Sequence, residues 1–275
     1  MTLRHLMILC FTLLLTVAAV AQDPKQALND ELWEAARKGD VAAVTAALDK
    51  GADVNAKFRY GQTALFKAAE RGHAPVVKLL IARGADVTVK DTYYGATAMT
   101  WALSGDHAEA VKELLAKDDG SGVGEVLMTG VREGKTPLVE VALAKGGLKP
   151  ETLTSAYAVV MDDKDKTAIA DMLKKAGATP PMQVDAAVLQ TYVGRFKPET
   201  GNDIVFSLKE GRLYAQPTGQ PAIAMMPTDK VTFKPVAFDG IVITFSVEGD
   251  KVPSFTLKQG PTTMVYKRVE ETKQP

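Results

Sequence analysis

Cysteine and histidine, which often supply the nucleophile or the base of an active site, are rare in this 275-residue chain. It contains one cysteine, Cys10, and three histidines, of which His73 and His107 lie beyond the first 21 residues. The spacings that place a nucleophile beside a base or a metal are absent from the sequence, because no Ser-x-x-Lys, Gly-x-Ser-x-Gly or His-Glu-x-x-His occurs. We therefore expect no catalytic residues and a protein that is not an enzyme.

Two short segments resemble ligand-binding motifs but lack an essential residue. Gly134-Lys135-Thr136 is similar to the end of a phosphate-binding loop, yet Thr129 stands where that loop needs its first glycine. Asp162 to Asp165 lacks the glycine and the glutamate of a calcium loop, and a solvated turn is the simpler interpretation. His73 and His107 occupy equivalent repeat positions and are expected to bond to a neighbouring loop. We therefore expect no cofactor and no metal.

The first 21 residues have the composition of a signal peptide. Arg4 and His5 precede an uncharged apolar run from Leu6 to Val20, and Ala19-Val20-Ala21 supplies the small residues that signal peptidase requires. The run is shorter than the ~20 residues of a membrane-spanning helix, although an uncleaved anchor is the alternative. We expect cleavage after Ala21, a periplasmic or secreted protein of the bacterial envelope, and no membrane attachment afterwards.

The balance of charge argues against a nucleic-acid partner. Lys and Arg number 33, as do Asp and Glu, so the formal net charge is zero. Proteins that bind nucleic acids need a basic excess to neutralise phosphates. Hydrophobic residues are 46% and charged residues 24% of the chain, which is typical of a folded protein. The length leaves room for about two domains.

A repeat of about 33 residues organises the first half of the chain. Gly51-Ala52-Asp53-Val54 recurs as Gly84-Ala85-Asp86-Val87, and Gly61 and Thr63 recur as Gly95 and Thr97. The central copy, 61–87, resembles the ankyrin repeat, although Thr63-Ala64-Leu65-Phe66 replaces the family's Thr-Pro-Leu-His. The resemblance implies stacked helix pairs whose finger loops and first helices form a concave, macromolecule-binding surface.

The repeats extend over residues 22–178 and become degenerate after about residue 117. Segments near 134–147 and 169–178 look like second helices of a fourth and a fifth copy, but neither has the Gly-x-Thr-x-Leu start. We expect helix pairs without well-formed fingers there. The alternative for residues 120–178 is a generic helical repeat that caps the array.

The predicted finger loops carry aromatic and cationic side chains, which supply much of the binding energy of protein interfaces when they are exposed. Glu34, Lys67 and Trp101 align at one first-helix position that should face water. Packing within the fingers, or of Trp101 over a neighbouring helix, is the alternative interpretation. The predicted partner is another, unidentified protein, and the oligomeric state is left open. The predicted partner-binding residues are Phe58, Arg59, Tyr60, Lys67, Arg71, Tyr93, Tyr94 and Trp101.

The periodicity changes after a linker at residues 179–185, which contains Pro180-Pro181 and cannot continue a helix. A short helix over 186–190 is followed by alternating apolar residues that are typical of strands, up to a tail at 271–275. In Ile241 to Val247, for example, alternate residues are apolar. We predict a small antiparallel β-barrel over 186–270. Its strands are expected at 192–196, 203–209, 212–217, 222–227, 230–235, 241–248, 251–258 and 263–269.

This second region is similar to the lipocalin-like C-terminal domain of some secreted β-lactamase-like serine peptidases. The similarity rests on Tyr192-Val193-Gly194-Arg195-Phe196, Asp203 to Phe206, Glu210 to Tyr214 and Lys267-Arg268-Val269. It implies a barrel without an active site of its own. The inward residues are bulky, which favours a filled core, although Met225-Met226 could line a pocket.

The sequence thus predicts an α+β multidomain protein, an ankyrin-like stack followed by an antiparallel β-barrel of about eight strands. The expected function is non-catalytic binding of another protein by the concave face and finger loops of the stack. The alternative is binding or transport of a small apolar ligand in the barrel.

Overall fold

The computed structural model describes residues 23–117, 120, 122–236 and 240–269. They form two compact units. The first ends at Lys117 and the second begins at Asp118. This division falls where the repeats become degenerate in sequence, and not at the linker of residues 179–185. The predicted signal peptide and C-terminal tail lie outside the described residues.

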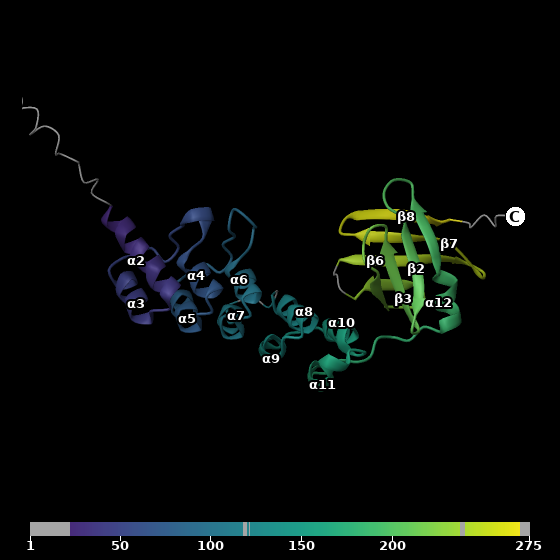
Figure 1. The fold of residues 1–275 in the computed structure, drawn as a ribbon, viewed down its shortest axis with the longest axis horizontal. Helices are drawn as coiled ribbons and strands as arrows, with labels where there is room; N and C mark the ends of the chain where they lie inside the picture. Colours follow the sequence, from purple (N-terminus) through teal and green to yellow (C-terminus); the bar gives the residue numbers. More distant parts are fainter. Residues whose placement is uncertain (1–22, 118–119, 121, 237–239, 270–275) are drawn as a thin grey trace, which may run out of the picture. The chain divides into compact units, whose positions relative to one another are not determined.

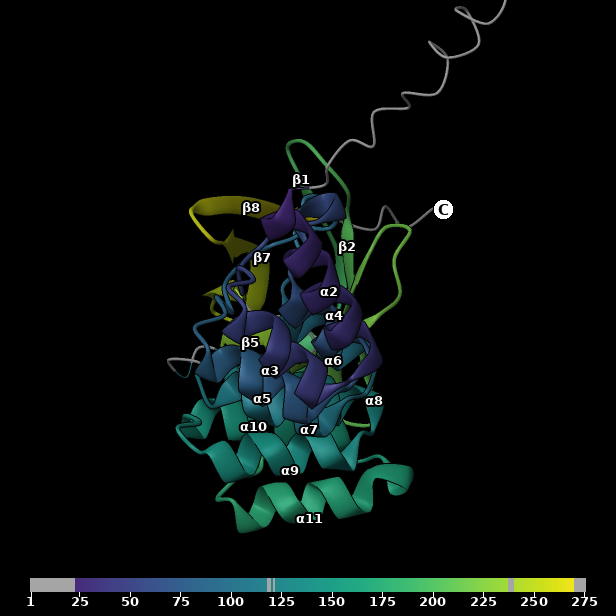
Figure 2. The ribbon, with the colours of Figure 1, turned by 90° about the vertical axis from the view of Figure 1, so that its left-hand side faces the viewer.

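The first unit is a stack of antiparallel helix pairs (Figures 1 and 2). Helix α4 packs between α2 and α6, and these three helices form one layer. Helix α5 packs between α3 and α7, and these form the other layer. The helices are α2 (Pro24–Lys38), α3 (Val41–Asp49), α4 (Ala64–Glu70), α5 (Ala74–Ala82), α6 (Ala98–Ser104) and α7 (Ala108–Leu115).

Small and branched apolar side chains allow these layers to approach closely. Ala68 and Ala69 on α4 are fully buried, as are Val77 and Leu80 on α5. Each pair leaves an apolar face that its neighbour covers, which is the packing principle of repeat proteins. Helix α4 ends before Gly72, whose φ of +71° is readily adopted by glycine.

Two finger loops, residues 53–63 and 86–97, precede α4 and α6 and project from the same side of the stack (Figure 1). The first contains the short 3₁₀ helix η1 (Arg59–Gly61). Main-chain hydrogen bonds close each loop, from Phe58 N–H to the Gln62 carbonyl (2.8 Å) and from Asp91 N–H to the Ala96 carbonyl (2.8 Å). The fingers predicted for the well-formed copies are therefore present.

The second unit begins with further helix pairs. The segments expected to be second helices form α9 and α11, and α8 contacts both α9 and α10. The elements are α8 (Val123–Glu133), α9 (Thr136–Lys145), α10 (Pro150–Val160), η2 (Lys164–Lys166) and α11 (Thr167–Lys175).

The second unit continues into a closed antiparallel barrel in which every strand pairs with the next and β1 pairs with β8. The predicted number and order of strands are confirmed. The tight β2–β3 turn has Glu210 and Gly211 at φ of +51° and +74°, as a two-residue hairpin turn requires. The strands are β1 (Gly194–Pro198), β2 (Ile204–Lys209), β3 (Arg212–Pro217), β4 (Ile223–Pro227), β5 (Thr232–Pro235), β6 (Ile241–Glu248), β7 (Lys251–Gln259) and β8 (Thr262–Arg268).

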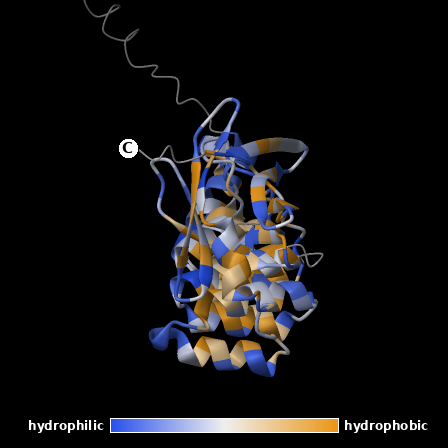
Figure 3. Ribbon diagram, turned by 90° about the vertical axis from the view of Figure 1, so that its right-hand side faces the viewer, coloured by the Kyte–Doolittle hydropathy of each residue, from blue (hydrophilic) through white to orange (hydrophobic). Residues whose placement is uncertain are grey.

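Aromatic rings fill the barrel. Hydrophobic and hydrophilic residues alternate along the strands (Figure 3), and the inward rings lie 4.2–6.0 Å apart between centroids. Helix α12 (Ala186–Tyr192) adds Leu189 and Tyr192 to this core. Leu208, expected inside, is only partly buried. The core rings are Tyr192, Phe196, Phe206, Phe233, Phe245, Phe255 and Tyr266.

Val247 departs from the face that the alternation of its strand predicts for it. Val247 was expected to share the face of Ile243 and Phe245, but its side chain is 47% exposed. The pairing of β6 with β7 shifts between Ser246 and Glu248. Two steps along β6 face three along β7 there, so the extra residue lies in β7. Val247 stands in this irregular end of the pairing, next to the β6–β7 turn.

Candidate functional site

Asp91 organises the second finger loop. Its side chain is buried, and its Oδ1 accepts hydrogen bonds from the backbone N–H groups of Tyr93 (3.0 Å) and Tyr94 (2.6 Å). Its Oδ2 accepts a hydrogen bond from the indole N–H of Trp101 (3.1 Å). Charge-assisted hydrogen bonds from several donors fix the position of a carboxylate. Asp91 therefore fixes the backbone at Tyr93 and Tyr94 from the buried side of the loop.

Burial and hydrogen bonding act on Asp91 in opposite directions. Burial disfavours the charged carboxylate and would raise its pKa. The hydrogen bonds from Tyr94, Trp101 and Tyr93 together outweigh burial, so the pKa of Asp91 lies below its ordinary value. The support is thus ionised at neutral pH.

Four aromatic rings form a continuous row across the two fingers. The centroid of Tyr60 lies 5.5 Å from that of Tyr93, Tyr93 meets Tyr94 edge-to-face at 4.5 Å, and Tyr94 lies 6.0 Å from Trp101. The backbone N–H of Thr92 donates to the Tyr60 carbonyl (2.8 Å). Tyr93 and Tyr94 are 66% and 71% exposed. The row therefore offers rigid, accessible ring surface.

Trp101 is half-buried and not fully exposed, contrary to what its alignment with Glu34 and Lys67 indicated. Its indole N–H is already used by Asp91. Trp101 is therefore partly a packing residue, because it supports the finger, and partly accessible beside the exposed tyrosines.

A second aromatic group lies at the first finger. The ring of Phe58 packs on Trp33 of α2 with centroids 4.4 Å apart, and the Lys67 ammonium lies 5.5 Å from the Trp33 ring. Lys67 also forms an ion pair with Glu70 (2.7 Å). Phe58 and Lys67 are therefore partly occupied by contacts within the stack.

The finger loops expose charged side chains of both signs. Lys57, Arg59 and Lys90 are exposed, and so are Asp53 and Asp86 at the start of each loop. The guanidinium of Arg59 lies 4.6 Å from the Tyr60 ring, a cation–π arrangement. Asp91, the acid of the second finger tip, is buried. Aromatic surface and positive charge are thus exposed together.

Arg71 stands apart from the finger tips. It is the exposed C-cap residue of α4, one helical turn beyond Lys67. The structure therefore groups Tyr60, Tyr93 and Tyr94 with Trp101, connects Phe58 with Lys67 through Trp33, and leaves Arg71 at the far end of the helix.

Sequence reasoning missed Trp33 and Asp91. Trp33 directly precedes the residue assigned to the water-facing column, and its repeat equivalent, Phe66, is buried. Asp91 was read only as part of a finger. The available signal was a single acid beside the two tyrosines of residues 90–94. Its hydrogen-bond partners could not be predicted, because they depend on the path of the loop.

The two histidines have the structural role expected for them. A ring nitrogen of His73 lies 3.1 Å from the Arg37 carbonyl, and the equivalent nitrogen of His107 lies 3.0 Å from the Glu70 carbonyl. Each ring connects one repeat to the preceding one.

The two motif-like segments of the second unit also have local roles. Gly134 has a φ of +72° and ends α8, and Thr136 begins α9, so this segment is a helix–helix turn. Asp163 accepts from the backbone of Asp165 (3.0 Å) in η2, and Asp162 pairs with Arg212 (2.7 Å). Among the described residues, no group of three or more His, Cys, Asp or Glu side chains is arranged to hold a metal ion.

Comparison with known families identifies the repeats. The family described as Ankyrin repeats (3 copies) matches residues 12–91 and 32–125. Together with the stacked helix pairs and fingers, this match shows that the N-terminal half consists of ankyrin repeats, which generally mediate protein–protein interaction. No curated protein matches the chain at a significant level.

Proposed function

We propose that this protein binds another protein through its finger loops and the concave face of its repeats, without catalysing a reaction. The observation that carries the proposal is the exposed row of Tyr60, Tyr93 and Tyr94, held by the buried Asp91. Preorganised aromatic residues bind with little loss of side-chain entropy.

The exposed cations of the fingers define the partner further. Arg59 lies against Tyr60, and Lys57 and Lys90 are exposed in the same two finger loops. Complementary charge accelerates association and selects among partners. The proposed partner therefore presents a surface with acidic and apolar groups. Phe58, Lys67 and Arg71 contribute at the margin of this contact.

Export is part of the proposal and rests on the composition of residues 1–21. N-terminal sequencing of the mature protein is expected to begin at Gln22. Among the described helices, none has the length and apolar character needed to cross a membrane.

We also propose that the barrel is related to the lipocalin-like domains that its sequence resembles. The closed eight-stranded antiparallel topology supports this relationship. The alternative function, a ligand inside the barrel, would require displacement of the rings that fill the core.

Site-specific photo-crosslinking tests the proposed interface. A photoreactive residue at Tyr93 should capture a partner in the exported fraction, whereas the same residue at Lys112 on α7 should not. With the purified partner, Tyr93→Ala combined with Tyr94→Ala should weaken binding about tenfold or more, and Lys112→Ala should leave it unchanged. Equal capture at both positions would contradict the proposal.

A further inference from the structure

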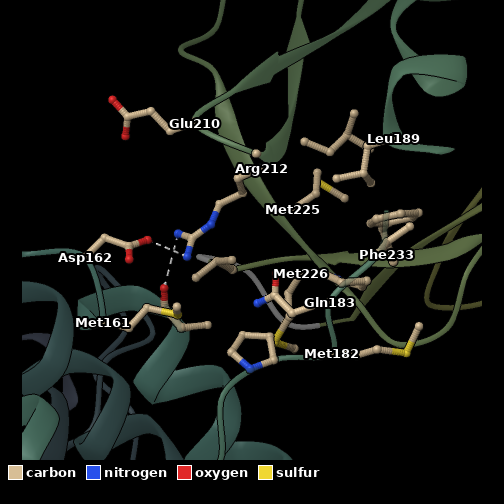
Figure 4. Close-up of a pocket in the computed structure, with 17 residues that line it drawn as sticks. Met161, Asp162, Met182, Gln183, Leu189, Glu210, Arg212, Met225, Met226 and Phe233 are labelled. Carbon is tan, nitrogen blue, oxygen red and sulfur yellow. Dashed lines mark hydrogen bonds and ion pairs between the residues drawn. The ribbon is translucent and has the colours of Figure 1, made fainter. Parts of the chain in front are cut away.

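The second unit contains a cavity of about 170 Å³ where α10 and the segment before α12 meet the barrel (Figure 4). Ala158 and Met161 form the wall on the α10 side, and Arg212 and Met226 form the wall on the barrel side. Pro181 to Val184 crosses between them.

This cavity adjoins the filled core of the barrel. Leu213, Met225 and Phe233 belong to the barrel core and also line one side of the cavity. Ala158 packs with Met226 and Val236 in a second, smaller apolar cluster. A ligand there would rest on the aromatic core without displacing it.

Thioether side chains make the cavity adaptable. Met161 at the end of α10, Met182 in the segment before α12, and the adjacent Met225 and Met226 of β4 all line it (Figure 4). Methionine is flexible and polarisable, and it fits ligands of irregular shape better than branched residues do. The walls are therefore suited to a compact hydrocarbon group.

Of the residues that the structure describes, Arg212 is the one cationic residue that lines the cavity, beside the carboxylates of Asp162 and Glu210. Its Nη2 lies 2.7 Å from Asp162 Oδ2, and its Nη1 lies 3.5 Å from the Ala158 carbonyl, at the limit of a hydrogen bond. The Arg212 side chain is 24% exposed, whereas that of Asp162 is 65% exposed. A guanidinium has five N–H donors, so this cation has donors for a second acceptor while its present partner lies largely in water.

We propose that the cavity binds a small organic carboxylate, with its hydrocarbon group among the methionines and its carboxylate paired with Arg212. A cavity of about 150 Å³ holds a benzene molecule, so the hydrocarbon group has about six carbon atoms. Arginine binds carboxylates through two parallel hydrogen bonds, and burial of the apolar group supplies further affinity. The site is independent of the finger loops and of the function proposed for them.

Calorimetric titration of the full chain with hexanoate and benzoate tests the proposal, with hexanol and benzyl alcohol as uncharged matches. The carboxylates should bind at least about tenfold more tightly than the alcohols, because charged hydrogen bonds add that much discrimination. In spectra of the ¹³C-labelled methionine methyl groups, Met225 and Met226 should shift, while Met99 in the first unit should not. Equal affinity for acid and alcohol, or no binding, would overturn the proposal.

Two substitutions separate an anchor from a structural ion pair. Asp162→Asn removes the competing carboxylate and should maintain or strengthen hexanoate binding, whereas Arg212→Gln should weaken it about tenfold or more. If the pair only ties α10 to the barrel, both variants would lower stability and neither would change binding selectively.

A third variant addresses the cavity directly and does not alter the charges. Val184 is a partly buried residue of the segment that crosses the cavity, and Val184→Trp should fill the space and abolish binding in a protein that still folds. Arg212→Lys, which retains the charge but loses the planar pair of donors, should bind with intermediate affinity. Full binding by the Val184→Trp protein would place the ligand elsewhere and refute the site.

Discussion

The indole N–H of Trp101 donates a 3.1 Å hydrogen bond to the carboxylate of Asp91, ten residues earlier in the chain. The same carboxylate accepts the backbone N–H groups of Tyr93 and Tyr94. One buried acid therefore connects the first helix of the third repeat to the most exposed tyrosines of the protein. Substitutions at Asp91 should reveal how far the shape of the finger depends on its charge.

Asp91→Asn should destabilise the first unit by about 2 kcal/mol, because hydrogen bonds to a charged acceptor become bonds to a neutral amide. Both tryptophans of the chain, Trp33 and Trp101, lie in this unit. Urea unfolding followed by tryptophan fluorescence therefore reports on it selectively. A variant as stable as the wild type would show that the finger does not need the charge.

The pH dependence of this difference has a definite sign. The pKa of Asp91 is lowered from 3.8 in the folded protein, so its stabilisation is fully present above that value and is lost as pH falls through the folded pKa. The wild type and Asp91→Asn should therefore differ most near neutral pH and converge in strong acid. A constant difference down to pH 2 would contradict this assignment.

The two repeat threonines should respond differently to the same substitution. Thr97 accepts from the backbone N–H of Thr100 (3.4 Å) and caps α6, whereas the buried hydroxyl of Thr63 has no hydrogen-bond partner among the described residues. Phe66, which stands where the ankyrin pattern has histidine, offers no polar atom. Thr97→Val should cost about 1 kcal/mol, and Thr63→Val should be neutral or stabilising. Equal losses in thermal unfolding would argue against this difference.

Gly72 and Gly51 form a second matched pair. Both have positive φ, +71° and +98°, so alanine costs about 1–2 kcal/mol of backbone strain at either position. A Cβ at Gly72 would also collide with the His107 ring, while a Cβ at Gly51 would meet nothing within 4 Å. Gly72→Ala should therefore be the more damaging by about 1–3 kcal/mol. A urea titration with similar midpoints for both variants would show that the histidine ring moves freely.

Arg268 should be the most sensitive polar residue of the barrel. Its guanidinium donates to the carbonyls of Val252 (2.7 Å), Val193 (2.7 Å) and Thr191 (2.6 Å). Arg268→Lys cannot reach three acceptors and should cost about 2–4 kcal/mol. Lys267→Met, at the exposed neighbouring position, should stay within about 0.5 kcal/mol. Unfolding followed by circular dichroism measures both, with tryptophan fluorescence expected to remain unchanged as the internal reference.

The sequence predicted those features of the fold that depend on short-range patterns. The repeat offset, together with Gly72 after α4 and Gly84 after α5, located the helix pairs. Alternating apolar residues on either side of turns such as Glu210-Gly211 located the strands. The exposure of Val247 was missed because it lies at the irregular end of the β6–β7 pairing, and alternation within one strand does not record how that strand pairs with the next. In the same way, Trp101 on α6 is half-buried beside the second finger loop, where it bonds to Asp91. The sequence period of the repeats does not predict a contact with an irregular loop.

The packing of α10 against the barrel is the other feature that sequence patterns could not show. Pro180-Pro181 ends helical structure, yet contacts between distant residues join α10 to the barrel, where Ala158 packs with Met226 and Val236 and Asp162 pairs with Arg212. A fragment of residues 118–275 should therefore unfold in one cooperative transition. A fragment of residues 182–275 should be less stable by about 1–3 kcal/mol, because Met226 and Val236 lose their apolar cover. Urea unfolding of the two fragments at equal concentration gives this difference directly, and equal midpoints would mean that the barrel gains nothing from α8 to α11.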